Sequence, residues 1–200
     1  LTRATGVPHV LEVHHVVGHP DAATRTEAIG AWMSRRYFPG AIKKAAATRT
    51  VNSAVRKLLI DWGAPAEKIA VVPSFYLDAS VLKPVTLEKK YDLVFCARLT
   101  ANKGLPAVLE TVKSIPGSTL LVIGDGPERI NCEALAKSLG IADRVTFVGW
   151  LPSQKDVVQA IQTAKIFVMN SSSEGGPRVA LEAMACGLPV IATRVGVMPD

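Results

Sequence analysis

The chain has 200 residues, of which 48% are hydrophobic, and it carries a formal net charge of +6. This composition can bury one large core or two small ones, and it excludes a disordered chain. No apolar run reaches the ~18 residues that a membrane-spanning helix needs. Three widely spaced cysteines (Cys96, Cys132 and Cys186) favour packed free thiols in a reducing compartment.

The positive charge is concentrated in the first half of the chain. Residues 1–90 contain thirteen Lys and Arg against seven Asp and Glu, whereas residues 91–200 contain ten of each. A nucleic-acid-binding surface would combine such charge with exposed aromatic residues or a recognition motif, and the sequence has no helix-turn-helix, RNP or zinc pattern. We therefore expect no nucleic-acid partner.

The first part of the chain alternates between strand-like and helix-like segments. We expect strands at residues 7–15, 44–53 and 68–75, and helices at residues 21–37 and 53–63, the second closed by Gly63. The segment KPVTLEKKYD then places a proline and several charges between two apolar blocks, as a linker does. A domain boundary is therefore expected at residues 85–90.

From Tyr91 onward, short apolar runs rich in β-branched residues recur at regular intervals. They predict strands, covered on both faces, at 91–99, 118–124, 144–150, 164–171 and 188–195. Helical patterns lie between them: Leu105, Val108, Leu109 and Val112 form one stripe, a second helix ends at Gly140, and a third begins at Ser153 with Asp156 behind it. This alternation predicts a doubly wound α/β domain with a parallel sheet.

Ligands of such sheets bind beyond the carboxyl ends of the strands, so the loops there are candidate sites. The loop VIGDGPE, residues 122–128, suggests a dinucleotide site, but Arg129 stands where G-x-G-x-x-G requires glycine. The strand that follows also ends without an acidic residue, so we expect no nicotinamide or flavin enzyme. Gly124 and Gly126 either let a ligand approach the backbone or are plain turn residues.

The stretch SSSEGGPRVALEAMA, residues 171–185, contains a turn that is suited to binding an anion. Gly175 and Gly176 give the backbone freedom, and Pro177 suits the first position of a helix. The amides of Gly176, Arg178 and Val179 would then point outward at a helix N-terminus, which attracts phosphate. The Arg178 side chain either adds positive charge there or points to solvent.

Two glutamates flank this turn. Glu174 lies just ahead of the helix, and Glu182 lies inside it within an apolar run. A carboxylate in an apolar setting costs free energy unless it is hydrogen-bonded, and ribose hydroxyls would be suitable donors. The alternatives are that Glu182 faces outward on an amphipathic helix and that Glu174 is a simple cap.

The loop CARLTANKGL, residues 96–105, carries two cations. Arg98 follows a predicted strand, Lys103 precedes a predicted helix, and Gly104 keeps the turn small. A planar guanidinium and a point-like ammonium could converge on a diphosphate. They could also be solvated surface charges.

The four histidines cluster near the start of the chain. His15 and His19 have the i, i+4 spacing of a metal pair on a helix, but Gly18 and Pro20 argue against a helix there. We therefore expect no metal site. His14, at the end of a predicted strand, is read as a group that faces a ligand across a cleft, or else as a packed histidine.

Together these motifs resemble the retaining glycosyltransferases of family 4, which have the GT-B fold and use nucleotide-sugar donors. The E-x7-E signature matches EGGPRVALE at 174–182, and the G-R-L-x-x-x-K-G phosphate motif appears as ARLTANKG, with Ala97 where glycine is usual. VIGDGPE, RVTFVGWL and the segment from NSAVRKLL to DASVLKP also match. The resemblance implies two Rossmann-like doubly wound parallel-sheet domains in a fragment truncated at both ends. Residues 1–84 would be the end of the acceptor-side domain, and residues 91–200 a truncated donor-binding domain.

The resemblance also implies roles for individual residues. Arg98 and Lys103 would hold the donor diphosphate, Glu182 the ribose, and Glu174 the hydroxyls of the transferred sugar, with His14 as the cleft histidine. Val197 follows Gly196 where the family usually has a second glycine. The implied donor site further includes Gly124, Gly126, Gly149, Trp150, Leu151, Gly175, Gly176, Pro177, Arg178 and Val179.

The implied function is transfer of a sugar, with retention, from a donor such as a UDP- or GDP-sugar to a polysaccharide, lipid-linked or small-molecule acceptor, without a metal or cofactor. Three alternatives stay open at this point. One is a non-catalytic nucleotide-sugar binding module, and another is an epimerase of the same fold. The third is a glycoside hydrolase with Glu174 and Glu182 as acid and nucleophile.

The segment TRTEAIGAWMSRRYFPGAIKK combines apolar and basic side chains. As a helix it could dock on an anionic membrane surface, where lipid-linked acceptors lie. This would make the protein a cytoplasmic, peripheral membrane enzyme of cell-envelope polysaccharide biosynthesis. The alternative is a core-facing stripe with solvated cations. The residues concerned are Ile29, Trp32, Met33, Tyr37 and Phe38, with Arg25, Arg35, Arg36, Lys43 and Lys44.

Overall fold

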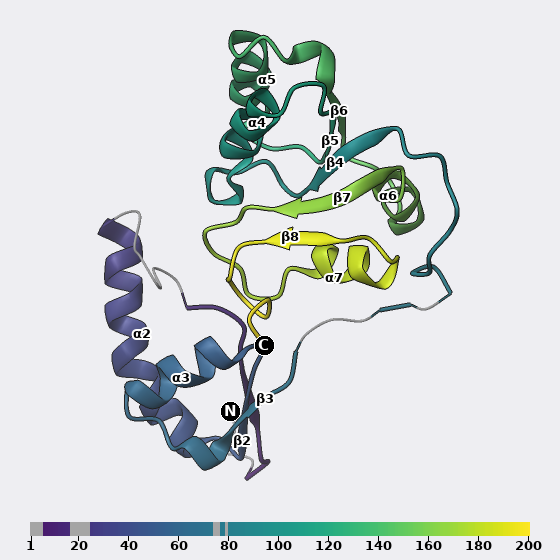
Figure 1. Ribbon diagram of the computed structural model, residues 1–200. Coiled ribbons are helices and arrows are strands. Elements are labelled where there is room, and N and C mark those ends of the chain that lie inside the picture. Colours follow the sequence, from purple (N-terminus) through teal and green to yellow (C-terminus); the bar gives the residue numbers. More distant parts are fainter. Residues whose placement is uncertain (1–5, 17–24, 74–76, 79) are drawn as a thin grey trace. The chain divides into compact units, whose positions relative to one another are not determined.

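The computed structural model describes residues 6–16, 25–73, 77–78 and 80–200 of the chain. The chain divides into two compact units (Figure 1). The first comprises Leu1–Phe75, Glu174–Gly176 and Val195–Asp200, and the second comprises Tyr76–Ser173 and Pro177–Arg194. Each unit contains a parallel sheet and a hydrophobic core of its own.

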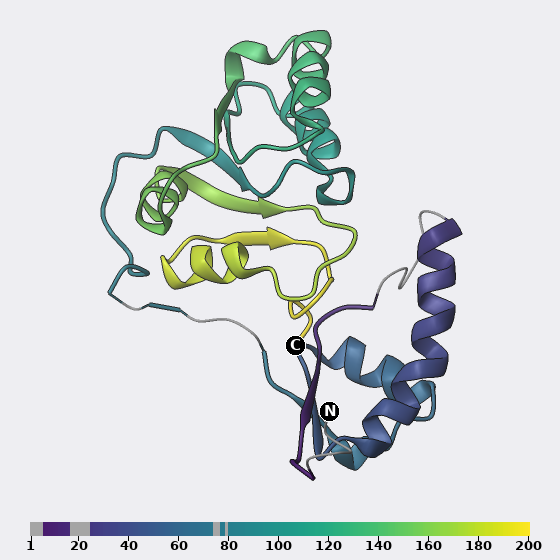
Figure 2. The ribbon, with the colours of Figure 1, turned by 180° about the vertical axis from the view of Figure 1, so that it is seen from behind.

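The first unit is built on a three-stranded parallel sheet of order β1-β2-β3. Its two helices lie on the same side of this sheet in both views (Figures 1 and 2), as right-handed connections between sequential strands require. Its buried core consists of Val13, Val16, Ile42, Val55, Leu59, Ala64 and Ile69. The elements are β1 (Val10–Val13), α2 (Arg25–Lys44), β2 (Ala47–Thr50), α3 (Ser53–Asp61), η1 (Ala66–Lys68) and β3 (Ile69–Val71).

Helix α2 continues to Lys44, seven residues beyond the end predicted from the sequence, although Pro39 lies inside it. Two contacts anchor this last part: Ile42 is fully buried, and the Lys68 ammonium donates to the carbonyls of Lys43 and Ala45 at 2.8 Å each. Tertiary contacts therefore outweigh the hydrogen bond that proline removes. Residues 21–24 of the predicted helix lie outside the described residues. In the described parts of the chain, no helix is both long and apolar enough to cross a membrane.

Helix α3 begins and ends where the sequence predicted. The Asn52 side chain accepts a hydrogen bond from the Val55 amide at 2.8 Å, which caps the first turn. Gly63 adopts a positive φ of 92° behind the last turn, and the Ala64 amide donates to the Leu59 carbonyl. The glycine stop is thus confirmed.

The second unit is built on a five-stranded, all-parallel sheet of order β6-β5-β4-β7-β8. Figures 1 and 2 show α4 and α5 on one side of this sheet and α6 and α7 on the other, which confirms the predicted doubly wound arrangement. The strands are β4 (Tyr91–Cys96), β5 (Leu120–Ile123), β6 (Val145–Gly149), β7 (Ala164–Met169) and β8 (Val190–Ala192). The helices are η2 (Ala101–Lys103), α4 (Leu105–Ser114), α5 (Arg129–Ser138), η3 (Ala142–Arg144), α6 (Gln154–Ile161) and α7 (Arg178–Ala185).

The helices of this unit follow their sequence signals. The predicted stripe of α4 is buried in full, from Leu105 to Val112. Gly140 closes α5 with a φ of 70°. The Ser153 hydroxyl accepts a hydrogen bond from the Asp156 amide at 3.2 Å, which is the predicted cap of α6. Residues 85–90 form no helix or strand, and the Val85 amide donates to the Gln162 side chain at 2.8 Å.

The strand order reverses between β4 and β7, so the loops that follow these two strands meet at the carboxyl edge of the sheet. The Ser172 amide donates to the Asn102 carbonyl at 2.8 Å, and the Asn170 side-chain amide donates to the Gly104 carbonyl at 3.0 Å. Gly104 has a φ of 67°, and a Cβ there would lie 2.3 Å from the Asn170 carbonyl oxygen. Only glycine allows this approach. Such a reversal point is where open α/β sheets bind ligands.

At the opposite edge, one carboxylate connects three strands. Asp92, near the start of β4, accepts from the Thr119 amide at 2.9 Å, the Thr119 hydroxyl at 3.0 Å and the Lys165 ammonium at 2.8 Å. Thr119 directly precedes β5, and Lys165 lies in β7. The Lys165 hydrogen bond, followed by those from Thr119, lowers the pKa of Asp92 from 3.8 to about 2.

Replacing Asp92 with alanine should lower the free energy of unfolding by about 1–2 kcal/mol at pH 7, because a charged acceptor of several hydrogen bonds is lost. The folded-state pKa lies below the ordinary value, so this contribution is full above about pH 4 and is lost as the pH falls through about 2. Urea unfolding of wild type and Asp92→Ala between pH 7 and pH 3 checks this. Asp143→Ala, at an exposed site, serves as the control. A difference that grows on acidification would contradict the assignment.

Replacing Gly104 with alanine should destabilise the second unit far more than the matched change Gly117→Ala. Both glycines have positive φ, 67° and 76°, so both variants carry the left-handed backbone penalty of about 1–2 kcal/mol. Only at Gly104 does the new methyl group collide with the Asn170 backbone, because nothing lies within 4 Å of a Cβ at Gly117. We expect a further loss of about 1–3 kcal/mol, as at overpacked sites. Equal unfolding midpoints in urea for the two variants would show that the loops do not meet here.

Candidate functional site

The turn after β4 places two cations at the carboxyl edge of the second unit's sheet. Arg98 is exposed in the loop, and Lys103 is half-buried at the end of η2. The Thr100 hydroxyl donates to the Asn102 side chain at 2.7 Å, which fixes the turn between the two cations. Because this turn is hydrogen-bonded to the loop after β7, Arg98 and Lys103 lie at the strand-order reversal.

The loop after β5 supports this turn from the other side. A Cβ at Gly124 would lie 1.9 Å from the Ala97 carbonyl oxygen, and a Cβ at Gly126 would lie 2.4 Å from that of Leu99. Both glycines are therefore required by the approach of one backbone to another, and they hold the loop that carries Arg98. That Gly124 and Gly126 also contact a ligand stays a prediction.

The end of β6 brings a further loop to the same edge. Gly149 has a φ of 73°, and its carbonyl accepts a hydrogen bond from the Gly124 amide at 2.7 Å. Trp150, the next residue, is 76% exposed, and Leu151 is partly buried. Gly149, Trp150 and Leu151, which the resemblance includes in the donor site, thus lie at the end of β6, the strand next to β5.

Glu182 is a buried acidic residue. It lies in the middle of α7, and only 6% of its surface is exposed, so the outward-facing alternative is wrong. Its Oε1 accepts hydrogen bonds from the Gln154 side-chain amide at 2.7 Å and from Arg178 Nε at 2.9 Å. The two donors compensate the cost of burying the carboxylate.

Cys96 shows which strand end lies near the Glu182 carboxylate. Burial, followed by the nearby Glu182 charge, raises the pKa of the Cys96 thiol to about 12. Cys96 is the last residue of β4, so the carboxylate lies near the carboxyl end of that strand. Burial also raises the pKa of Cys132 and Cys186. All three thiols are free and neutral at pH 7, which confirms the predicted packed thiols.

The start of α7 differs from the prediction by one residue. Pro177 is the N-cap, with ψ at 81°, and the helix begins at Arg178. The Ala180 amide donates to the Pro177 carbonyl at 3.1 Å, so proline closes the first turn from outside. The Arg178 side chain forms an ion pair with Glu182. Val179 follows Arg178 in the first turn of the helix.

The remaining predicted residues belong to the first unit. Within this unit the Asn52 side-chain amide donates to the Gly175 carbonyl at 2.9 Å. A Cβ at Gly175 would lie 3.1 Å from the His14 carbonyl oxygen. Neither Gly175 nor Gly176 has a positive φ, so space rather than left-handed backbone requires the first glycine. The loop that begins at Glu174 thus lies against the end of β1.

The His14 side chain is held by a carboxylate of its own strand. Its Nε2 lies 3.0 Å from Glu12 Oε2, and the other Glu12 oxygen accepts from Arg49 at 2.9 Å. The hydrogen bond with His14, followed by that with Arg49, lowers the pKa of Glu12. His14 is half exposed, so the packed-histidine alternative is wrong. His19, Gly18 and Pro20 lie outside the described residues.

Sequence reasoning missed three residues that support the site: Glu12, Asn52 and Gln154. The i, i+2 spacing of Glu12 and His14 in a strand was an available signal, because such residues share a face. Asn52 donates to Gly175, which is 123 positions further along the chain, and Gln154 donates to Glu182, which is 28 positions further. No local sequence pattern therefore points to either residue. Among the described residues, no group of three or more His, Cys, Asp or Glu side chains could hold a metal ion.

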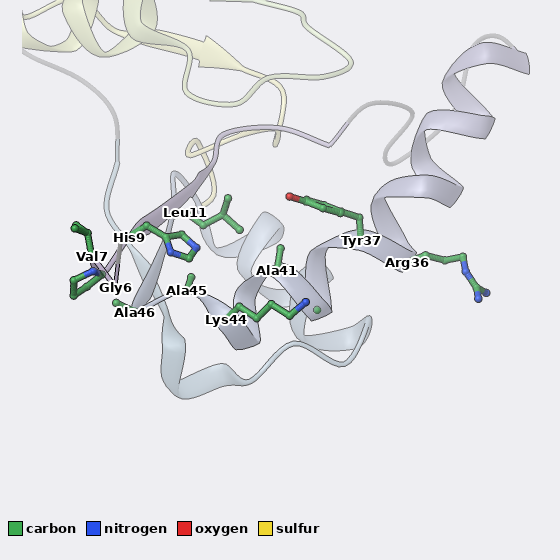
Figure 3. A pocket seen from close by; sticks show the side chains of 12 residues that line it. Gly6, Val7, His9, Leu11, Arg36, Tyr37, Ala41, Lys44, Ala45 and Ala46 are labelled. Carbon is green, nitrogen blue, oxygen red and sulfur yellow. The ribbon is translucent and has the colours of Figure 1, made fainter. Parts of the chain in front are cut away.

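A groove of about 850 Å³ lies elsewhere in the first unit. His9, Leu11, Tyr37 and Lys44 line it, and Figure 3 shows them between β1 and the second half of α2. Other lining residues directly precede β1 and β2, so the groove lies at the amino ends of the strands. His14 and Gly175 lie at the carboxyl ends, and the groove is therefore separate from the predicted site.

Three comparisons with known proteins bear on this arrangement. The lipopolysaccharide core biosynthesis glycosyltransferase LpsE of Rhizobium meliloti is 35% identical over 127 residues, which cover 64% of this chain and 34% of LpsE. The D-inositol 3-phosphate glycosyltransferase of Acidothermus cellulolyticus is 33% identical over 217 residues, covering 96% and 48% of the two chains. The crystal structure of Anabaena HepE in complex with UDP and glucose superposes with a TM-score of 0.77 at 21% identity, covering 98% and 55%.

The HepE likeness concerns the fold, and it confirms the α/β fold of GT-B type with Rossmann-like parallel sheets. The chain spans about a third to a half of the length of these relatives. Residues 81–200 match the family described as Glycosyl transferases group 1. This match includes the Arg98–Lys103 turn and the whole of α7, and it covers more than half of the chain. The chain therefore belongs to the glycosyl transferases of group 1, as its motifs implied.

Proposed function

We propose that this protein transfers a sugar, with retention, from a nucleotide-sugar donor to a carbohydrate or lipid-linked acceptor. One observation carries the proposal: a buried, hydrogen-bonded carboxylate, Glu182, lies near the end of β4, the strand whose following turn carries Arg98 and Lys103. Glu182 can accept hydrogen bonds from the ribose hydroxyls of a nucleoside diphosphate. The two cations at the same sheet edge can bind its diphosphate.

The chemistry assigned to the cations is stabilisation of the leaving group. Transfer breaks the bond between the sugar and the diphosphate, so negative charge develops on the departing oxygen. Arg98, Lys103 and the N-terminus of α7 can stabilise that charge without reorganising, which is the largest single contribution in many enzymes. These groups also supply the positive charge that a metal ion would otherwise bring.

The carboxylates have a different role in this proposal. Glu182 accepts hydrogen bonds from the ribose, and Glu174 accepts them from the transferred sugar, so neither needs to move a proton. The hydrogen bonds from Gln154 and Arg178 favour this reading over a hydrolytic acid or nucleophile, because both end on Glu182 Oε1 and that oxygen is already engaged. His14, which the resemblance assigns to the catalytic residues, has its ring held by Glu12.

The comparisons narrow the ligands to be tried. HepE was solved with UDP and glucose, and LpsE is named for lipopolysaccharide core biosynthesis. We therefore place UDP-hexoses first among donors. Acceptors of cell-envelope polysaccharide synthesis come first among acceptors.

Lys103→Ala and Glu182→Gln should each weaken binding of UDP at least about tenfold, because each removes a charge-assisted hydrogen bond. Lys113→Ala, an exposed lysine at the far end of α4, should leave the affinity unchanged. Ligand-observed NMR with a panel of nucleotide sugars measures this. The anomeric form of the transferred product tests retention.

Unchanged affinity in both variants would contradict the site. Binding without transfer by the protein would favour a non-catalytic module. Release of free sugar from a glycoside in the absence of nucleotide would favour a hydrolase. Conversion of the donor's sugar to another sugar in the absence of acceptor would favour an epimerase.

We further infer that the protein works at the inner face of the cytoplasmic membrane, held there by α2. Four apolar side chains of this helix, Ile29, Trp32, Met33 and Tyr37, are 58–66% exposed. They do not form a core-facing stripe, which was the competing interpretation; only Phe38 and Ile42 pack against the core.

The same helix carries the positive charge that an anionic bilayer attracts. Arg36 lies over the Trp32 ring at 5.6 Å, so cation and aromatic ring are presented together. Each basic residue near an anionic leaflet contributes about 1 kcal/mol, and exposed aromatic rings enter the headgroup region. The helix contains four arginines and lysines besides Arg36, against the single acidic residue Glu27.

The double variant Trp32→Ser/Tyr37→Ser should co-sediment with vesicles of phosphatidylcholine and phosphatidylglycerol at least about tenfold more weakly than wild type, because two interfacial anchors are lost. Ile130→Ser, at an exposed apolar residue of α5, is the matched control and should not change binding. Wild-type binding should also vanish on pure phosphatidylcholine. Equal sedimentation of wild type and the double variant would rule out docking through α2.

A further inference from the structure

The hydrogen bonds of the buried carboxylate are distributed unevenly. Both donors to Glu182, the Gln154 amide and Arg178 Nε, end on the same oxygen, Oε1. A carboxylate offers about four acceptor sites on two oxygens. With Oε1 already occupied twice, Oε2 is the oxygen available to a ligand.

The two donors differ in how firmly they are held. The Arg178 side chain is 53% exposed and lies one turn before Glu182 on the same helix. Gln154 is the first residue of α6, and the Ser153 cap fixes its backbone through hydrogen bonds of the hydroxyl with the Asp156 amide at 3.2 Å and carboxylate at 2.6 Å. Gln154 therefore connects the start of α6 to the middle of α7.

The orientation of the Gln154 amide follows from its partner. The contacting oxygen of Glu182 accepts the hydrogen bond, so the NH2 group of Gln154 and not its carbonyl faces it. At 2.7 Å this is a short, charge-assisted hydrogen bond. Unlike arginine, the neutral amide adds no charge that could draw the carboxylate away from a neutral hydroxyl.

We propose that Gln154 is a positioning residue that turns the free Oε2 of Glu182 toward the ribose hydroxyls of the nucleotide donor. This inference rests on the proposed function and assigns the recognition of ribose to a pair of residues on different helices. Gln154 follows the end of β6 by five residues, at the edge where Gly149 and Trp150 lie. It acts on the ligand through Glu182 alone.

The test compares UDP, 2′,3′-dideoxy-UDP and inorganic pyrophosphate by calorimetry on the whole protein. Wild type should prefer UDP over the dideoxy compound at least about tenfold, because hydrogen bonds to a charged group are lost. Gln154→Met, which keeps the length but removes the donor, should reduce that preference to less than about threefold and leave pyrophosphate binding unchanged. Gln154→Asn, too short to reach Glu182, should do the same and replaces the Met variant if that variant does not fold.

Two controls separate positioning from a general structural effect. Gln154→Lys keeps an N–H donor of similar reach and should retain the preference for UDP. Gln159→Met makes the same change at an exposed position of α6 and should behave as wild type. Thermal unfolding followed by circular dichroism establishes that each variant is folded.

The outcomes distinguish this inference from the proposed function. If wild type prefers UDP and the Met and Asn variants keep the full preference, Gln154 does not position Glu182 and the inference is overturned. If wild type binds UDP and dideoxy-UDP equally, the ribose assignment fails while nucleotide binding stands. If wild type binds no nucleotide, both the inference and the proposed function are overturned.

Discussion

The close approach of two backbone turns at the strand-order reversal is the constraint on which the second unit depends. The loop after β4 and the loop after β7 share hydrogen bonds because Gly104 leaves no side chain between them. Gly124 and Gly126 allow a third loop to lie against the first. A parallel sheet brings the carboxyl ends of its strands to one edge, but only such missing side chains let the loops meet closely enough to fix cations in position.

The buried carboxylate is the second element of the site, and its stability comes from outside its own segment. Glu182 would be costly in an apolar helix face without Gln154 and Arg178. Its charge in turn contributes to the raised pKa of Cys96, which keeps that thiol neutral. Arg178, which the sequence left open between added positive charge at the helix end and solvent, forms an ion pair with this carboxylate. The proposed anion site therefore relies on Arg98, Lys103 and the N-terminus of α7.

The first unit contributes surfaces of two kinds. At the carboxyl ends of its strands, Asn52 and the backbone of His14 hold the Glu174–Gly176 loop, so one buried side chain both caps α3 and supports the glycine pair. Along α2, exposed aromatic and apolar side chains lie beside basic ones. The apolar pattern of that helix could be read as core-facing, and the exposure of Trp32 and Tyr37 decides against that reading.

The sequence by itself determined the strands and helices of the second unit, their parallel doubly wound order, and the caps at Ser153, Gly63 and Gly140, because these depend on local patterns and on chain connectivity. Its motifs also identified the family, and they predicted a role for Arg98 and Lys103 in the site. Tertiary structure decided the remainder: the burial of Glu182, its partner Gln154, the hold of Asn52 on Gly175, and the length of α2 past Pro39. Each of these depends on groups far apart in the chain, and periodicity within one segment carries no information about which distant side chain will lie against it.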